Sequence, residues 1–252
     1  MSVSSKFTVV IPARYESSRF PGKPLIDLAG KSMIQRVFEQ ASQSSASRVV
    51  VATDDDRIVA EVERFGGEAV MTDPGHASGT DRIHEAVGLL NLDTHDVVVN
   101  VQGDEPLIPP AVIDRVASLT GDEVRMATLC ERITDREDVV NPNIVKVVRD
   151  QQGIALYFSR APVPWDRARF PEGSDLSQPG WYRHLGIYAY TVSLLADFVG
   201  WTPAQLELTE SLEQLRVLTN GEKIRVEETT ESIPPGIDSP EDVERTLDAL
   251  KG

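Results

Sequence analysis

Three cations stand in one short loop directly after the first apolar run of the chain. The residues from Phe7 to Ile11 are expected to form a β-strand, and Arg14, Arg19 and Lys23 follow it. An open α/β sheet binds its ligands just beyond the carboxyl ends of its strands. Charge-assisted bonds to phosphate are worth about 1.5–3 kcal/mol each, so the loop suits a triphosphate. By residue type alone, a solvated surface loop with three ordinary cations is the alternative.

Two further segments bring polar groups to places where such a ligand would lie. Asp104 follows an apolar strand at residues 96–102, and Mg²⁺ is usually held by one or two carboxylates together with substrate phosphates. Ser78, Gly79 and Thr80 open a helix, and their amides and hydroxyls can bind a base or a phosphate. An ordinary N-cap explains these three residues as well, and the two roles are compatible.

The elements that position these residues alternate between apolar strands and amphipathic helices. Strands are expected at residues 7–11, 48–53, 68–72, 96–102 and 223–226. Helical spacing predicts helices around residues 34–41, 58–65, 83–90 and 212–218, and a last helix with Ser239 as its N-cap. Continuous apolar strands between helices are typical of a parallel sheet covered on both faces. The sequence therefore predicts an α/β fold with a doubly wound, mostly parallel mixed sheet.

The pattern changes after about residue 125. Residues 144–148 and 154–158 flank a polar turn and predict a hairpin. Ten of the fifteen aromatic residues lie between Tyr157 and Trp201, which favours an inserted lobe, a substrate pocket, an oligomer interface or a combination of these. We expect one domain over residues 1–252, with a smaller aromatic-rich lobe at approximately residues 140–205.

Composition excludes several classes of protein. The formal net charge is -15 without any Lys/Arg run, which argues against a nucleic-acid binder, although a local basic loop remains compatible with it. Cys130 is the only cysteine, so no intrachain disulfide can form and a reducing compartment is expected. The first apolar run is too short for a signal peptide, and no later run approaches the length of a membrane span. We expect a cytoplasmic protein that binds neither nucleic acid nor membrane.

The first loop, with Ile11-Pro12-Ala13-Arg14 in front, resembles the signature of the sugar nucleotidylyltransferases, and in particular of the cytidylyltransferases that act on 3-deoxy acidic sugars. Six more motifs occur in family order: Ser78–Arg82, Asn100–Pro106, Tyr157–Arg160, Arg183–Tyr188, Glu210–Leu215 and Pro235–Asp238. Together they resemble the 3-deoxy-manno-octulosonate (Kdo) cytidylyltransferases, or CMP-Kdo synthetases, over residues 7–244. At the matched positions the chain departs only in Asp81, where an Asp replaces the family's Glu.

This resemblance implies a nucleotide-diphospho-sugar transferase-like fold and a reaction that joins CTP to Kdo and releases pyrophosphate, for lipopolysaccharide biosynthesis. It implies Mg²⁺ as the cofactor, with Asp104 and Asp238 as its ligands; Ser239 is the better helix cap, which leaves Asp238 free. The implied catalytic residues are Arg14, Arg19, Lys23, Asp104 and Asp238. The implied nucleotide-binding residues are Pro12, Ala13, Arg14, Lys23, Ser78, Gly79, Thr80, Arg82 and Gln102. The implied sugar-binding residues are Arg160, His184, Tyr188, Glu213 and Gln214.

Several alternatives stay open at this point. An 8-amino analogue of Kdo has the same acidic end as Kdo, and the first loop and Asp104 would also serve enzymes for sialic acid or a sugar 1-phosphate. The motifs around Arg160, His184 and Glu213 favour Kdo. A non-catalytic nucleotide-binding protein on the same fold is a third interpretation. A homodimer is expected, with its interface in the aromatic-rich stretch, unless those rings only fill the lobe's core and sugar pocket.

Overall fold

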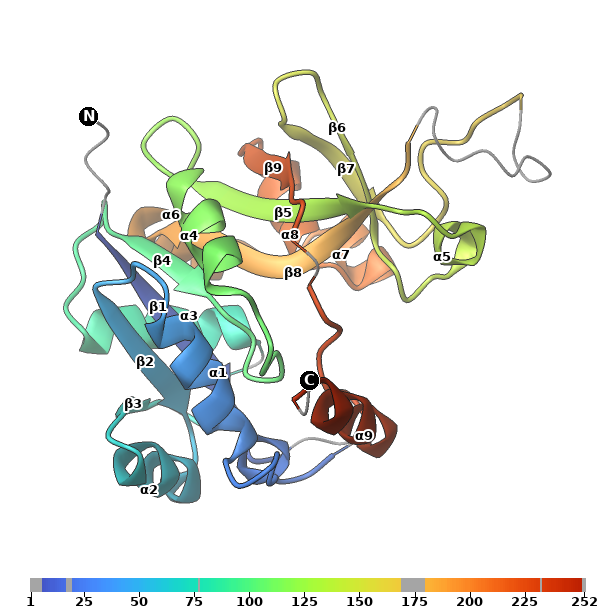
Figure 1. The fold of residues 1–252 in the computed structure, drawn as a ribbon. Helices are drawn as coiled ribbons and strands as arrows, with labels where there is room; N and C mark the ends of the chain where they lie inside the picture. Colours follow the sequence, from blue (N-terminus) through green and yellow to red (C-terminus); the bar gives the residue numbers. More distant parts are fainter. Residues whose placement is uncertain (1–5, 17–19, 77, 169–179, 232, 251–252) are drawn as a thin grey trace.

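The computed structural model describes residues 6–16, 20–76, 78–168, 180–231 and 233–250, and one mixed sheet runs through the molecule (Figure 1). Its main strands lie in the order β3-β2-β1-β4-β8-β5-β9. Only β8 runs antiparallel to its neighbours in this order. The strands are β1 (Phe7–Ala13), β2 (Arg48–Thr53), β3 (Glu68–Met71), β4 (Val97–Asn100), β5 (Met126–Arg132), β8 (Tyr182–Thr191) and β9 (Ile224–Glu228). The predicted mixed, mostly parallel sheet is confirmed.

Helices cover both faces of this sheet because the central strands are apolar on both sides. In β1, Val9 and Ile11 face one core and Val10 faces the other. The first core also contains residues from α1 (Met33–Ser42), α2 (Asp56–Arg64) and α4 (Pro110–Ser118). The second contains residues from α3 (Gly79–Leu89), α6 (Val192–Gly200) and α8 (Gln214–Thr219). The fold is therefore doubly wound, as the sequence predicts.

Two predicted helix starts are found as capping boxes. Ser78 caps α3 and Ser239 caps α9 (Pro240–Ala249), and in each case the aspartate three residues later bonds back to the cap. The helix expected around residues 212–218 is found as α8. The short helix α7 (Gln205–Glu210) before it is not predicted by the sequence, and it ends where Ser211 adopts a left-handed conformation with φ 52°.

The predicted hairpin consists of β6 (Lys146–Arg149) and β7 (Ala155–Ser159), and it projects from the main sheet (Figure 1). The short helix α5 (Arg136–Val140) precedes it in the chain. The Asp150 carboxylate shapes its turn by accepting bonds from the amides of Gln152 and Ile154. Other parts of the predicted aromatic-rich stretch belong to the main layers, since β8 lies between β4 and β5 and α6 packs in the second core.

After β9 the chain leads to α9, which lies beside the start of α1 (Figure 1). Val243 and Leu247 of α9 pack with Leu28, Met33 and Ile237 in a small separate core. The C-terminal helix thereby holds residue 238 close to the loop that follows β1. No helix in the described part of the chain is long and apolar enough to cross a membrane.

Candidate active site

Lys23 joins three segments that are far apart in the sequence. It begins the 3-10 turn η1 (Lys23–Leu25) after the first loop. Its Nζ donates to Asp104 Oδ2 and to the carbonyl of Ile237, both at 2.8 Å. Asp238 Oδ1 lies 3.7 Å from the same nitrogen. A positive charge therefore stands where the two predicted metal-binding carboxylates converge.

Two glycines permit this close convergence. A Cβ at Gly103 would lie 2.8 Å from the carbonyl oxygen of Pro12, closer than real Cβ contacts come. A Cβ at Gly236 would lie 3.1 Å from the carbonyl oxygen of Asp104, and the amide of Ile237 bonds to that oxygen at 2.9 Å. The Asp104 loop is thus packed between the end of β1 and the segment before α9.

A cavity of about 350 Å³ opens beside Lys23. Its walls bring together most of the predicted nucleotide-binding residues and Asp104: it is lined by Pro12, Ala13, Arg14, Glu16, Lys23, Pro24, Met33, Gln102, Gly103 and Asp104. The start of α3 lies against this wall, since the position of a Cβ on Gly79 is 3.8 Å from Cγ of Pro12. The first loop and the α3 motif therefore meet at Pro12. Arg19 lies outside the described residues.

The carboxylates fit a divalent cation. Within the described ranges no cluster of three or more His, Cys, Asp and Glu side chains could hold a metal, but Asp104 and Asp238 already converge on one cation. Two carboxylates completed by substrate phosphates are what Mg²⁺ commonly uses. Glu105 is unsuited to the task, because burial and the neighbouring Asp104 charge raise its pKa to about 8 and leave it protonated at neutral pH.

The described part of the chain also contains a smaller cavity of about 50 Å³. Glu105, the residue after Asp104, lines it together with Arg183, His184 and Gly236. The two cavities are also linked by Gln102, which lines the first and whose Nε2 lies 3.5 Å from the carbonyl oxygen of Gly186 in the wall of the second.

The predicted sugar-binding residues gather around β8. His184 and Tyr188 are ring neighbours, with centroids 5.3 Å apart. Glu213 accepts a bond from Thr80 Oγ1 through Oε2 at 3.0 Å. Its other oxygen, Oε1, and Nε2 of Gln214 are buried without a hydrogen-bond partner among the described residues. Buried polar atoms of this kind are rare in folded proteins, so the pair is suited to bond the hydroxyls of a ligand.

Arg160 is anchored by backbone oxygens. Its guanidinium donates to the carbonyls of Glu210 at 2.7 Å, Pro142 at 2.9 Å and Ser211 at 3.3 Å. Its own amide donates to the Glu210 carboxylate at 2.9 Å. In the described part of the chain, no carboxylate lies within ion-pair distance of this guanidinium. Its positive charge is thus available to an acidic ligand.

Arg82 is placed differently from the other predicted nucleotide contacts. Its side chain is fully buried, with Nη2 2.5 Å from Asp54 Oδ2 and Nη1 bonded to Thr72 Oγ1. These contacts tie α3 to the ends of β2 and β3, and Arg82 does not line the cavity beside Lys23.

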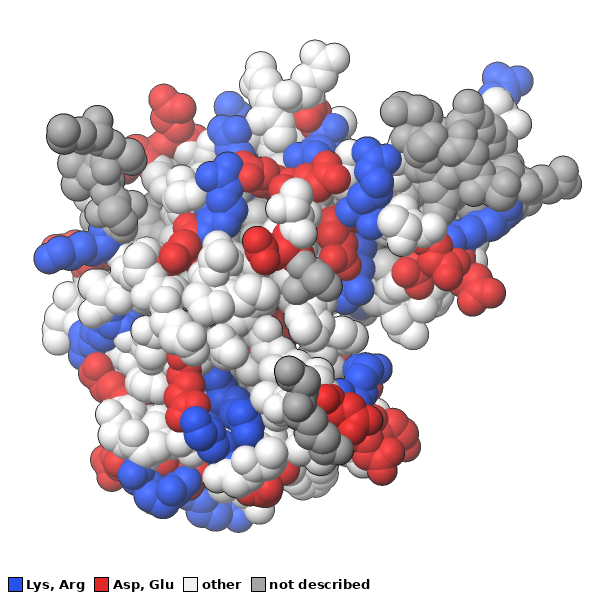
Figure 2. All heavy atoms as spheres, in the orientation of Figure 1, with Lys and Arg blue, Asp and Glu red and all other residues white. Residues whose placement is uncertain are grey.

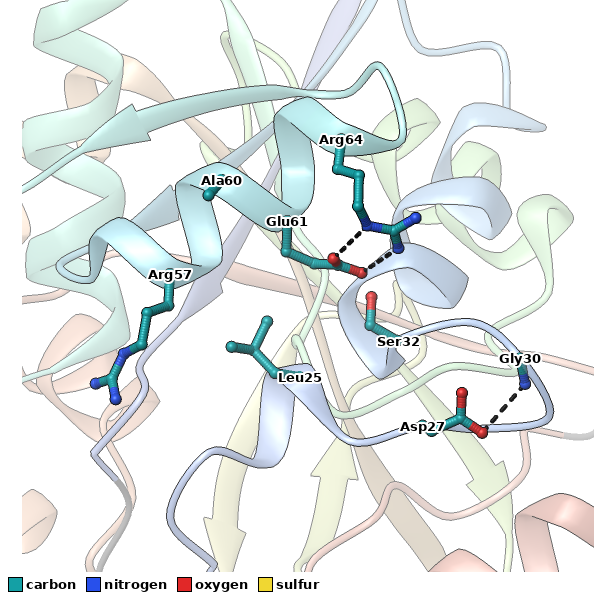
Figure 3. Close-up of a pocket in the computed structure, with 8 residues that line it drawn as sticks. All are labelled: Leu25, Asp27, Gly30, Ser32, Arg57, Ala60, Glu61 and Arg64. Atoms are coloured by element: carbon teal, nitrogen blue, oxygen red, sulfur yellow. Dashed lines mark hydrogen bonds and ion pairs between the residues drawn. The ribbon is translucent and has the colours of Figure 1, made fainter.

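A larger cavity of about 480 Å³ lies between α2 and the start of α1, and its charged side chains are already paired (Figure 3). Arg64 bonds to Glu61 at 2.7 Å, Asp27 accepts from the amide of Gly30 at 3.1 Å, and Arg57 bonds to Asp55 at 2.6 Å. The charged side chains of this cavity therefore already have partners. We do not assign it as the active site, although its volume is larger than that of the cavity beside Lys23.

Two residues near the site are not among the predicted site residues. Thr128 is a fully buried residue of β5 whose hydroxyl lies 3.0 Å from His184 Nε2. Tyr15 stacks beneath Arg57 of α2, with the guanidinium carbon 3.2 Å from the ring centroid. Both contacts join segments that are distant in sequence, so only the folded chain identifies them.

Comparisons with known proteins agree with this geometry. The profile of the family described as Cytidylyltransferase matches residues 8–224. A 3-deoxy-manno-octulosonate cytidylyltransferase of Vibrio vulnificus (strain CMCP6) is 55% identical over 248 residues, covering 97% of this chain and 99% of that protein. The protein of the same name from Pseudomonas syringae pv. syringae (strain B728a) is 55% identical over 254 residues, covering 99% and 100%. A solved CMP:2-keto-3-deoxy-manno-octonic acid synthetase, complexed with CTP, superposes with a TM-score of 0.89 at 40% identity, covering 98% of this chain and 99% of that one.

Proposed function

Because this chain belongs to the cytidylyltransferase family and, within it, to the 3-deoxy-manno-octulosonate cytidylyltransferases, we propose that it binds CTP in the cavity beside Lys23 and Kdo among the side chains around β8, and joins them as CMP-Kdo. Pyrophosphate is the other product. The observation that carries the proposal is the position of Lys23 between Asp104 and Asp238, in the wall of the larger of the two cavities described around the Asp104 loop.

The cavity beside Lys23 is the proposed CTP site. Arg14 and Lys23 would bond the triphosphate and neutralise the charge that develops on pyrophosphate, while Pro12, Ala13 and Gln102 would contact the nucleoside. The expected role of Arg19 is the same as that of Arg14. Ser78, Gly79 and Thr80 are proposed to complete this site from the start of α3.

Nucleotidyltransferases typically use a divalent metal ion, and we assign Mg²⁺ to Asp104 and Asp238. When bound, the ion supplies charge neutralisation at the phosphates and lowers the pKa of the attacking sugar hydroxyl. The chain's own residues position the two substrates: Lys23 fixes the spacing of the two aspartates, and the Asp104 loop is held from both sides by glycine contacts. Positioning and charge account for most of the catalysis in such reactions.

The predicted sugar-binding side chains around β8 form the proposed Kdo site. Arg160 offers a planar fork that fits the sugar's carboxylate. Glu213 and Gln214 offer their buried unpartnered atoms to hydroxyls. His184 contributes a neutral ring, since burial lowers its pKa to about 3, and Tyr188 packs beside it. We assign no side-chain general base and no covalent intermediate; burial raises the pKa of Cys130 to about 12, so its thiol stays protonated.

A homodimer and a cytoplasmic location also belong to the proposal. Two leucines on neighbouring elements at the hairpin side of the molecule support the dimer: Leu156 of β7 is 63% exposed and Leu208 of α7 is 68% exposed. β7 and α7 are joined by the bond from Ser159 Oγ to Glu210 at 2.7 Å. Exposed apolar groups of this kind are typical of interfaces. Acidic and basic side chains are interspersed on the face drawn in Figure 2, which fits small-molecule substrates better than nucleic acid.

Pyrophosphate release tests the function directly. With CTP, Kdo and Mg²⁺ present, we expect turnover that disappears when the sugar or the metal is omitted. The same assay with the 8-amino analogue, sialic acid and other nucleoside triphosphates determines the specificity. Turnover with sialic acid and none with Kdo or its 8-amino analogue would contradict the assignment.

A further inference from the structure

A single buried hydroxyl lies next to one ring nitrogen of His184. The pairing of β5 with β8 shifts between Thr128 and Leu129, so that Thr128 stands opposite Tyr188 while Leu129 stands opposite Leu185. Such a bulge redirects backbone and side-chain groups and is common beside active sites. Thr128 Oγ1 lies 3.0 Å from the carbonyl oxygen of Leu185, 2.7 Å from that of Ile187 and 3.0 Å from His184 Nε2.

The chemistry of these three neighbours determines which atom carries the proton. A threonine hydroxyl has one proton to donate, and a carbonyl oxygen can only accept. If Thr128 donated to His184, its oxygen would face two carbonyl oxygens at bonding distance with no hydrogen between them. The proton therefore points to a carbonyl, of which Ile187 is the nearer, and His184 Nε2 must be the donor to Thr128.

We infer that Thr128 is a positioning residue that fixes His184 in the Nε2–H tautomer, so that the unprotonated Nδ1 accepts a hydrogen bond from a hydroxyl of the acidic sugar. The assignment of the sugar rests on the proposed function, whereas the assignment of the tautomer does not.

The surroundings of the ring support both parts. The edge-on ring of Phe158, 5.0 Å away, and the ring of Tyr188 hold the imidazole in place, and the His184 amide bonds to the carbonyl of Val145 at 2.8 Å. No described residue hydrogen-bonds to Nδ1, and the ring lies on the face of the sheet that carries Phe158 and Tyr188. A neutral imidazole with one free acceptor nitrogen matches the hydroxyl of a sugar and offers nothing to a carboxylate or a phosphate.

Nuclear magnetic resonance of the protein labelled with ¹⁵N-histidine tests the tautomer without any substrate. The chain has four histidines, so the ring signals can be assigned by single substitutions. We expect His184 to show a protonated Nε2 and an unprotonated Nδ1. Thr128→Val keeps the shape but removes the acceptor, and it should give a mixture of the two tautomers, whereas Thr128→Ser should keep the wild-type pattern.

Kinetics with the same variants test the contact with the sugar. Thr128→Val should raise KM for Kdo by about two- to tenfold, the range of one neutral hydrogen bond, and leave KM for CTP and kcat nearly unchanged. Thr128→Ser should restore the wild-type KM. Thr120→Val is the matched control, because it removes another buried threonine hydroxyl, bonded to Val116, away from the ring.

Each outcome decides one part of the inference. An Nδ1–H tautomer in the wild type, or an unchanged pattern in Thr128→Val, overturns the role of Thr128. The expected tautomer with an unchanged KM for Kdo overturns the sugar contact alone. If the wild type shows the expected tautomer but has no activity with Kdo, the proposed function fails and the tautomer assignment stands.

Discussion

At the scale of single residues, Lys23 lies between two aspartates that differ in exposure. The side chain of Asp104 is 31% exposed and that of Asp238 is 69% exposed. Ion pairs this accessible to water contribute no more than about 1 kcal/mol to folding. The convergence of the two aspartates on Lys23 is therefore better explained by the reaction than by stability.

Asp104→Asn and Asp238→Asn should therefore reduce kcat strongly and leave the melting temperature nearly unchanged. We expect a loss of about 100-fold or more, since several kcal/mol of charge stabilisation depend on a bound metal ion. Asp197→Asn is the matched control, because it removes the aspartate of an ion pair with Arg125 at 2.7 Å outside the site. Steady-state assays and thermal melts measure both effects; near-normal turnover of Asp238→Asn would show that it is not a metal ligand.

Arg160 and Lys23 should separate the two substrates. Arg160→Ala removes a guanidinium that forms no direct ion pair with a described carboxylate, so KM for Kdo should rise by about tenfold or more while KM for CTP changes little. Lys23→Ala should instead raise KM for CTP more than KM for Kdo. Equal effects of each substitution on both KM values would mean that Arg160 and Lys23 are assigned to the wrong substrates.

His184 should make stability depend on pH in the acid range. Burial, assisted by the Arg183 charge, lowers its pKa from 6.5 to about 3 in the folded protein. The unfolded chain then binds more protons between these values, so the contribution of His184 is fully present above pH 6.5 and is lost as the pH falls towards 3. The slope is at most about 1.4 kcal/mol per pH unit. Urea unfolding of the wild type and His184→Gln should show a steeper acid loss in the wild type; parallel curves would contradict the shift.

The sequence predicts some of these residues well and others not at all. Arg14, Lys23 and Asp104 follow apolar strands, and parallel strands end at one edge of a sheet, so their meeting could be expected. The burial of Arg82 could not, because its partners Asp54 and Thr72 belong to no recognisable pattern. The contact of Thr128 with His184 could not be predicted either, because the register shift that places its hydroxyl there depends on pairing between distant strands.

At the scale of elements, α2 supports the loop that carries the predicted phosphate-binding cations. Arg57 of α2 stacks on the ring of Tyr15, and the carbonyl of Tyr15 accepts a bond from the amide of Gly22 at 2.8 Å. Tyr15 thus contacts Arg57 through its ring and Gly22, the residue before Lys23, through its carbonyl. Asp55 holds the guanidinium from the other side through Nε and Nη2.

Arg57→Ala should consequently raise KM for CTP by about two- to fivefold, the effect of one exposed cation–π contact, with little change in the melting temperature. Arg64→Ala is the matched control: Arg64 lies on the same helix and pairs with Glu61 at 2.7 Å, but its pair is directed toward the cavity between α2 and α1 (Figure 3). Tyr15→Phe keeps the ring and should behave like the wild type. Equal KM values for the Arg57 and Arg64 variants would remove the proposed support.

Element boundaries follow the local sequence only where local chemistry determines them. The capping boxes at Ser78 and Ser239 are complete in the sequence and in the structure. The end of α7 at Ser211 has no such signal, because this left-handed position is occupied by a serine and not by the glycine that usually marks it. The carbonyl of Ser211 accepts a bond from Arg160, the residue that follows β7. A contact with a distant segment is therefore made at the residue where α7 ends.

At the scale of the whole molecule, the sheet and both helical layers are predictable because each strand is short, apolar and separated from the next by a helix. The antiparallel direction of β8 could not be predicted, because the residues of an apolar strand do not indicate whether it runs parallel or antiparallel to its neighbours. That reversal brings Tyr188 and His184 to the edge where Asp104 and Glu213 lie, so the proposed sugar site depends on topology as much as on residues.

The homodimer is the prediction that belongs to this scale. If the hairpin side forms the interface, light scattering at micromolar concentration should give about twice the 27.7 kDa of one chain. Introducing a charge at Leu156 or Leu208 should shift the protein toward the monomer, because a buried unpaired charge costs several kcal/mol. Leu89→Asp is the matched control, since Leu89 is a similarly exposed leucine (52%) on α3, away from the hairpin. A wild-type mass of one chain would exclude the dimer, and a dimer that persists in both leucine variants but not in Leu89→Asp would place the interface on α3 instead.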